Sequence, residues 1–199
     1  MKKRFLINTN VLSYFGLFPL LMLSVVGCAN AEQQTTAEWQ TIDRYQVKDD
    51  LVKDTKTGLM WMRCSLGQKW DGSTCQGKAE QYNFGEKLQV TDYFSRHAHA
   101  GYSDWRLPKR EELKTLVYCS NGQVGADTDI TGRFCNENSA KPAIEKTVFP
   151  ETVSSGFWSS SPCDAGYACV WGVSFGSGGY TPGDLEYNNF AIRMVRGAE

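Results

Sequence analysis

The sequence lacks any excess of positive charge, because its 21 Lys and Arg residues are matched by 22 Asp and Glu residues. A polybasic nucleic-acid-binding surface is therefore not expected. Charged residues are also scarce, at 22% of the chain, and 19 glycines are spread among short segments, which excludes a coiled coil or a long helical bundle. Apolar and aromatic residues reach 41% and 13%, which is enough for one packed core and excludes intrinsic disorder.

The amino terminus lacks an apolar run long enough to span a membrane. A basic cluster at residues 2–4 precedes an apolar stretch over residues 12–26. A membrane span needs roughly 20 residues, and Pro19 weakens a helix interior. A basic start, a short apolar stretch and small residues after it are instead the layout of a cleaved secretory signal peptide.

The end of this stretch, Val25-Val26-Gly27-Cys28, resembles the lipobox of bacterial lipoproteins. The resemblance implies that residues 1–27 are the signal peptide and that Cys28 carries the lipid that anchors the protein to the membrane. The alternative is an ordinary signal peptide cut near Ala31, which would discard Cys28. Ala29 rather than Asp follows the cysteine, which by analogy favours the bacterial outer membrane, with the domain either periplasmic or surface-exposed.

The remaining six cysteines form three neighbouring couples in a chain that is expected to reach an oxidising compartment. We predict three disulfides, which would each stabilise the fold by roughly 2 to 3 kcal/mol on the chain-entropy estimate. None of the couples has the short spacing that is typical of zinc ligands. The predicted pairs are Cys64 with Cys75, Cys119 with Cys135, and Cys163 with Cys169.

Beyond the signal peptide, the chain divides into a tether and one domain. Residues 28–41 are small and polar, which predicts a flexible tether, and the domain is expected to span residues 42–199. Removal of residues 1–27 takes away three basic residues and no acid, which leaves 18 basic against 22 acidic residues. The mature surface is therefore expected to be mildly acidic.

Local patterns predict a mixed secondary structure. Residues 51–54 and 59–62, joined by a turn that contains Gly58, indicate a β-hairpin. Apolar spacing predicts a helix from about Lys78 to Arg96, and a second helix from Pro108 to near Cys119. Residues 119–150 are expected to be loop, and the short apolar runs from Phe157 onward are expected to be strands.

Four segments in this order resemble one family, the Lcl C-terminal domain family, named after the end of the Legionella collagen-like adhesin. Each motif is weak alone, but the ordered set covers about residues 44–197. The segments are Asp54-Thr55-Lys56-Thr57-Gly58-Leu59-Met60-Trp61, Gly101-Tyr102-Ser103-Asp104-Trp105-Arg106-Leu107-Pro108, Phe157-Trp158-Ser159-Ser160-Ser161 and Ile192-Arg193-Met194-Val195-Arg196-Gly197.

The resemblance implies a fold and a type of function. The expected fold class is α+β: a compact C-type-lectin-like domain with two helices and small antiparallel sheets, stabilised here by disulfides. The adhesin's domain trimerises and binds sulfated glycosaminoglycans, so the resemblance allows a homo-oligomer. This chain has no collagen-like stalk and a mildly acidic mature composition, which weakens the carry-over of sulfated-glycan binding, because such ligands usually need clustered Arg and Lys.

The conspicuous side chains of these motifs favour a structural role over chemistry. Buried packing explains the four motif tryptophans as well as ligand stacking does, and core is the favoured reading. Arg106 is expected to form an internal ion pair with Glu111 or Glu112. The tryptophans are Trp61, Trp105, Trp158 and Trp171.

Enzymatic chemistry is not expected from the remaining motifs. The only histidines, His97 and His99, share a face only on a strand, whereas here they follow a predicted helix, so they favour no metal site. A hydrolase would need one of them, and the sequence has no G-x-S-x-G motif. Formylglycine-generating enzymes share the expected fold but need free cysteines.

One acidic segment partly matches a calcium loop. Asp127 and Asp129 stand where calcium ligands would stand, but Thr131 and Asn138 replace the usual ligands at later positions. These two aspartates are weak calcium candidates, and no other cofactor is expected.

The best sequence candidate for ligand binding lies near residues 176–183, a polar, glycine-rich segment between two late strands. Aromatic side chains there could stack on a sugar ring, and an extended strand from residue 184 to 188 would place its acidic and amide groups on one face. A solvent-facing strand or loop is the alternative. The candidate residues are Tyr180, Asp184, Glu186, Tyr187, Asn188 and Asn189.

The sequence therefore predicts a lipid-anchored envelope module for carbohydrate binding or protein recognition, acting in adhesion or biofilm. The alternative is a structural or assembly protein that binds another envelope component. An enzyme on envelope polymers is the least favoured reading, because no perturbed catalytic group is evident.

Overall fold

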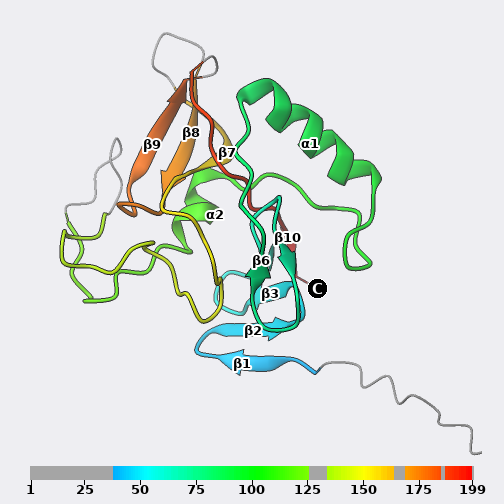
Figure 1. Ribbon diagram of the computed structural model, residues 1–199, viewed down its shortest axis with the longest axis horizontal. Coiled ribbons are helices and arrows are strands. Elements are labelled where there is room, and N and C mark those ends of the chain that lie inside the picture. The colour runs from blue at the N-terminus through cyan, green and yellow to red at the C-terminus, as the bar shows by residue number, and fades with distance from the viewer. Residues whose placement is uncertain (1–37, 126–133, 164–168, 185–186, 199) are drawn as a thin grey trace, which may run out of the picture. The chain divides into compact units, whose positions relative to one another are not determined.

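The computed structural model describes residues 38–125, 134–163, 169–184 and 187–198 (Figure 1). Cys28, the expected signal peptide and residues 28–37 of the expected tether lie outside the described residues. The last two tether residues, Gln40 and Thr41, belong to strand β1 (Gln40–Ile42), so the predicted tether was too long at its carboxyl end. Within the described part of the chain, no helix has the length and apolar character that a membrane crossing requires.

A five-stranded antiparallel sheet joins the two ends of the domain. Its strands are β1 (Gln40–Ile42), β2 (Tyr45–Lys48), β3 (Leu51–Asp54), β4 (Leu59–Met62) and β10 (Val195–Gly197), in the order β1-β2-β3-β4-β10. The predicted hairpin is confirmed as β3 and β4, with Asp54 opposite Leu59 and Gly58 at a φ of +67° in the turn. Because β10 pairs with β4, the carboxyl end returns to the first hairpin.

A second sheet accounts for the predicted β-rich carboxyl half. It contains β7 (Gly156–Pro162), β8 (Cys169–Ser174) and β9 (Tyr180–Asp184), which lie side by side in Figure 1. A small separate hairpin, β5 (Lys69–Trp70) with β6 (Cys75–Gln76), lies between the first sheet and the helices along the chain.

Helix α1 (Phe84–Arg96) begins six residues later than the sequence predicted. Asn83 and Glu86 form a capping box: the Asn83 side chain accepts from the Glu86 amide at 3.0 Å, and the Glu86 carboxylate accepts from the Asn83 amide at 2.9 Å. The residue before the cap, Tyr82, pairs its backbone with Phe190 instead. The predicted start at Lys78 was wrong because this distant pairing holds the chain extended.

Helix α2 (Arg110–Lys114) is one turn long, so the predicted helix from Pro108 to Cys119 was too long at both ends. Pro108 lies before the helix, and its carbonyl accepts from the Ser160 amide of β7 at 2.8 Å. After the helix the backbone tightens into i→i+3 bonds, and the Tyr118 amide then bonds to Ala143. Tertiary pairing on either side thus limits α2, which lies against β7 and β8.

All three predicted disulfides are present: Cys64–Cys75, Cys119–Cys135 and Cys163–Cys169. The first closes a loop that contains β5 and β6. The described parts of residues 119–150 contain no helix or strand beyond isolated bridges, as the sequence predicted. The α+β, disulfide-stabilised class is therefore confirmed.

The first sheet is buried on both faces. Val52, Trp61 and Val195 belong to one apolar cluster, whereas Met60 and Met62 belong to the other, as the two-residue period of a strand requires. Three of the motif tryptophans, Trp61, Trp105 and Trp158, are buried, and Trp171 is half-buried. The core interpretation is confirmed for the first three.

The motif arginine Arg106 also has the structural role that the sequence favoured. Its guanidinium makes two hydrogen bonds of 2.7 Å to the Glu112 carboxylate, and Glu111 pairs with Arg110 at 2.6 Å.

Arg193 is fully buried without a carboxylate partner in the described residues. One terminal nitrogen donates to the carbonyls of Met62, at 2.9 Å, and Arg63. The other donates to the hydroxyls of Ser65, at 3.2 Å, and Thr152, at 2.8 Å. Burial lowers the pKa of this guanidinium to about 9, but the group keeps its positive charge at neutral pH.

We expect Arg193→Lys to destabilise the domain strongly. The ammonium keeps the buried charge, but its single nitrogen cannot reach the two carbonyls and the two hydroxyls together. The expected loss is about 2 to 4 kcal/mol in the free energy of unfolding, measured by urea denaturation at pH 7. The control is Arg96→Lys on the exposed face of α1, which should change stability by less than about 0.5 kcal/mol. Equal losses in both variants would contradict the assigned role.

Candidate binding site

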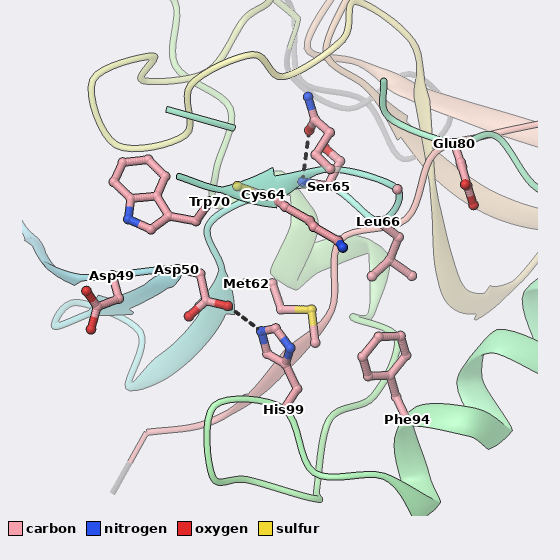
Figure 2. Close-up of a pocket in the computed structure, with 13 residues that line it drawn as sticks. Asp49, Asp50, Met62, Cys64, Ser65, Leu66, Trp70, Glu80, Phe94 and His99 are labelled. Atoms are coloured by element: carbon pink, nitrogen blue, oxygen red, sulfur yellow. Dashed lines mark hydrogen bonds and ion pairs between the residues drawn. The ribbon is translucent and has the colours of Figure 1, made fainter. Parts of the chain in front are cut away.

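A cavity of about 730 Å³ lies between the β2–β3 turn, the Cys64–Cys75 loop, the end of α1 and the loop after it (Figure 2). This volume is typical of small-molecule sites. In Figure 2, Trp70 and Asp49 lie on one side, Glu80 and Phe94 on the other, and Asp50 and His99 between them. The lining residues are Asp49, Asp50, Met62, Cys64, Ser65, Leu66, Gly67, Gln68, Lys69, Trp70, Glu80, Phe94 and His99.

Trp70 is the aromatic wall of the cavity. It is the last residue of β5, opposite Cys75, so the disulfide and the hairpin both restrain it. The guanidinium of Arg63 lies over its ring, 3.9 Å from the centroid. Because Arg63 covers one face of the half-buried indole, a ligand ring can stack only on the opposite face.

Arg63 is itself held in place by backbone carbonyls. Its Nε donates to Val148 at 3.0 Å, and a terminal nitrogen donates to Asp49 at 3.2 Å. Burial lowers the pKa of Arg63, but the group remains a cation at neutral pH. The indole of Trp70 therefore rests on a fixed charge rather than on a mobile side chain.

An Asp–His pair lies in the centre of the cavity. His99 Nε2 lies 2.7 Å from Asp50 Oδ2, and each side chain is about a third exposed. The hydrogen bond from His99 lowers the pKa of the Asp50 carboxyl, against a smaller opposing effect of burial. Trp105 fixes the other side of the pair, since its indole nitrogen donates to the His99 carbonyl at 3.0 Å.

Two residues beside this pair have left-handed backbone conformations. Asp49, in the two-residue turn between β2 and β3, has a φ of +51°, and Ala100 has a φ of +50°. Such a conformation costs a residue other than glycine roughly 1 to 2 kcal/mol, least for Asp or Asn. Strain of this kind persists where the surrounding structure imposes it, and it clusters at ligand sites.

The charged groups around the cavity are mainly acidic. The acidic residues are Asp49, Asp50 and Glu80, and the one lysine among the lining residues is Lys69. The Glu80 carboxylate also accepts from the Tyr82 hydroxyl at 2.6 Å, and burial together with this bond raises the pKa of Tyr82. A polyanion would meet net repulsion here, whereas hydroxyl or amine donors would find carboxylate acceptors.

The predicted ligand segment has a different structure from the one expected. Tyr180 belongs to strand β9 rather than to a loop. Its ring lies 6.0 Å from that of Trp171, with the Arg110 guanidinium 4.9 Å and the Lys114 ammonium 5.2 Å from its centroid. Tyr180 is half-buried in these contacts.

The predicted extended strand through residues 184–188 was also wrong, because β9 ends at Asp184. The Asn188 side chain accepts from the Asp184 amide at 2.7 Å, and the Tyr187 amide donates to the Asp184 carboxylate at 3.3 Å. These bonds close a turn, which leaves Tyr187 79% exposed, Asn188 half-buried and Asn189 exposed. Glu186 lies outside the described residues.

The two histidines serve separate contacts. His97 stacks on Tyr93 with ring centroids 4.1 Å apart, whereas His99 contacts Asp50. No group of three or more metal-binding side chains occurs within the described ranges. The calcium candidates Asp127 and Asp129 lie outside those ranges.

Sequence reasoning missed the main members of the cavity. Trp70 lies outside the family motifs, and Asp50, Glu80 and His99 come from separate segments. The available signals were a tryptophan inside a disulfide loop and an Asp-Asp turn between two strands.

Comparison with known proteins identifies one family model, described as the Lcl C-terminal domain, which matches residues 50–196. No curated protein and no solved structure matches the chain.

We expect the Asp50–His99 pair to make stability depend on pH in the acid range. The folded-state pKa of Asp50 is below its ordinary value of 3.8, so its contribution is present above that value and is lost as the pH falls through the folded-state pKa. Asp50→Asn should therefore cost up to about 1 kcal/mol at pH 7 for this partly exposed pair. The cost should shrink below about pH 4.

Thermal unfolding of both proteins between pH 2.5 and 7 checks this. The control is Asp92→Asn, which removes the exposed pair with Arg96 on α1 and should cost only a few tenths of a kcal/mol. A penalty for Asp50→Asn that stays constant to pH 2.5 would contradict the linkage.

Proposed function

Because the chain belongs to the Lcl C-terminal domain family, we propose that it is an adhesin-type binding module of the bacterial envelope that recognises a glycan at the Trp70 cavity. Its place would be in attachment or in a biofilm matrix. We also propose that the α+β domain, residues 42–199, has the C-type-lectin-like arrangement that the family resemblance implies.

The observation that carries this proposal is the supported indole of Trp70. A sugar ring presents an apolar C–H face that packs on an aromatic face, and its hydroxyls need hydrogen-bond partners at the ring edge. Trp70 offers one uncovered face, and Asp49 and Asp50 offer acceptors in the same cavity. Arg63 holds the indole before the ligand arrives, which reduces the entropic cost of binding.

The charge around the cavity supports a glycan without sulfate groups. Three carboxylates and one ammonium line it, whereas a sulfated chain needs clustered Arg and Lys. The proposed ligand therefore differs from the sulfated glycans that the adhesin's domain binds.

Binding without catalysis is the simpler role for the Asp50–His99 pair. A carboxyl acts as a general acid at neutral pH only when its pKa is raised, whereas the pKa of Asp50 is lowered and its carboxylate is already paired. In a binding site, an ionised and oriented carboxylate serves as a fixed acceptor.

The second candidate function is recognition of another envelope protein. Leu88 and Tyr93 on α1 are 53% and 54% exposed, although their five-residue spacing places them on different sides of the helix. A structural or assembly role would use this helix surface rather than the cavity.

We expect Trp70→Ala to weaken glycan binding about tenfold or more, because it removes the aromatic face on which the sugar ring would stack. The test is an array of neutral, amino and sulfated polysaccharides probed with the detergent-purified full chain, with calcium and with chelator. Tyr187→Ala is the matched control, since it removes an exposed aromatic residue from the segment that the sequence favoured.

If glycan binding is lost in Tyr187→Ala but not in Trp70→Ala, the binding site lies at the turn after β9. If the folded wild-type protein binds none of the glycans, recognition of another envelope protein becomes the favoured function. Loss of binding in chelator would direct attention to Asp127 and Asp129.

We also propose that residues 1–27 are a signal peptide, that the residues from Cys28 to the start of β1 are a tether, and that lipidated Cys28 anchors the module to the outer membrane. Cys28→Ala should release the protein from the membrane fraction, because the several acyl chains of a lipoprotein supply the anchor at about 0.8 kcal/mol per buried methylene. Fractionation and the mass of the amino-terminal peptide check this. An unmodified mature chain that starts beyond Cys28 would contradict it.

A further inference from the structure

A second cavity of about 310 Å³ adjoins the first at Trp70. The two cavities share Trp70 and Asp49 as lining residues. The smaller one is otherwise formed by the first two strands and the β5–β6 turn, through residues such as Gln40, Lys48 and Ser73. Trp70 and Asp49 thus lie between the two cavities.

The shared wall is rigid. Arg63 lines only the smaller cavity, lies 3.9 Å from the ring centroid of Trp70 and donates to the Asp49 carbonyl. One fixed guanidinium therefore orients both wall residues. A ligand that crosses this wall would meet preformed partners on each side.

The chemistry of the smaller cavity suits an uncharged ligand. Its charged residues are balanced, with Glu38 and Asp49 against Lys48 and Arg63. Ser73 and Gln40 add neutral polar groups. Since the larger cavity is acidic, the two together present no cationic track for a sulfated or carboxylated polymer.

We propose that the two cavities are adjacent subsites of one groove that binds an internal stretch of a non-acidic polysaccharide, with sugar units on both sides of Trp70. This rests on the proposed function, and it adds that the site reads a run of units rather than a chain end. A single ring stacks on Trp70 in the larger cavity, and the neighbouring unit crosses Asp49 into the smaller one.

The test measures affinity against chain length. The probes are β-1,4-linked oligomers of N-acetylglucosamine, of glucosamine and of glucose, each from one to six units, titrated into the detergent-purified full chain. For at least one series the affinity should rise about tenfold or more between one and four units and then level off, since a second subsite worth about 1.4 kcal/mol gives tenfold.

A variant that fills only the smaller cavity tests the subsite itself. Ser73 is exposed in the β5–β6 turn, so Ser73→Tyr should leave the affinity for the single sugar within twofold and abolish the gain with length. The matched control is Ser177→Tyr, an exposed serine in the β8–β9 turn, which should behave as wild type. Equal melting temperatures show that each variant is folded.

Each remaining outcome overturns one proposal or both. Affinity that does not depend on length, or a length gain that survives Ser73→Tyr, overturns the second subsite and leaves glycan binding at Trp70 intact. Binding to other array glycans with silence of all three series also overturns only the groove. Silence of the folded protein on the array and on all three series overturns both.

Discussion

The buried guanidinium of Arg193 is the interaction on which the site depends. A charge removed from water must find acceptors, and Arg193 finds them in the Met62 and Arg63 carbonyls and in the hydroxyls of Ser65 and Thr152. The first three of these groups lie where β4 enters the Cys64–Cys75 loop. The same contact therefore sets the backbone of Arg63, whose side chain supports Trp70. One buried cation thus orients a second, and the second orients the aromatic wall.

Helix α1 depends on another buried cation. Lys87 is 3% exposed, and its ammonium lies 4.2 Å from the ring centroid of Phe84 and 5.3 Å from that of Trp158. Burial lowers its pKa to about 8, so part of the population is neutral in mildly alkaline conditions. This anchoring holds the helix whose last turn brings Phe94 to the cavity. Leu88 and Tyr93 of α1 remain exposed.

The sequence predicted those features that are determined by residues close together in the chain, and it missed those that depend on distant residues. The β3–β4 hairpin needs only its own turn and Gly58, and each disulfide joins close neighbours in the chain, so both were predicted correctly. The start of α1 was missed because Tyr82 pairs with Phe190, more than 100 residues away. The cavity was missed for the same reason, since Asp50, Trp70 and His99 meet only through tertiary contacts. Tyr180 was favoured for its polar, glycine-rich surroundings, but strand pairing and the Arg110 contact occupy it.

Several of the cations that could bind a sulfated ligand are committed to internal contacts, which bears on the choice of ligand. A cavity of about 410 Å³ is lined by Arg44, Lys56 and Lys114, and by residue type alone it would suit an anion. Arg44, however, pairs with buried Asp54 at 3.2 Å and donates to the Thr115 carbonyl. Lys114 donates to the Gly178 carbonyl. A sulfate would have to compete with these contacts, each of which holds a segment of the fold. A shared family fold therefore need not carry a shared ligand charge, because the same cations can serve the structure in one member and the ligand in another.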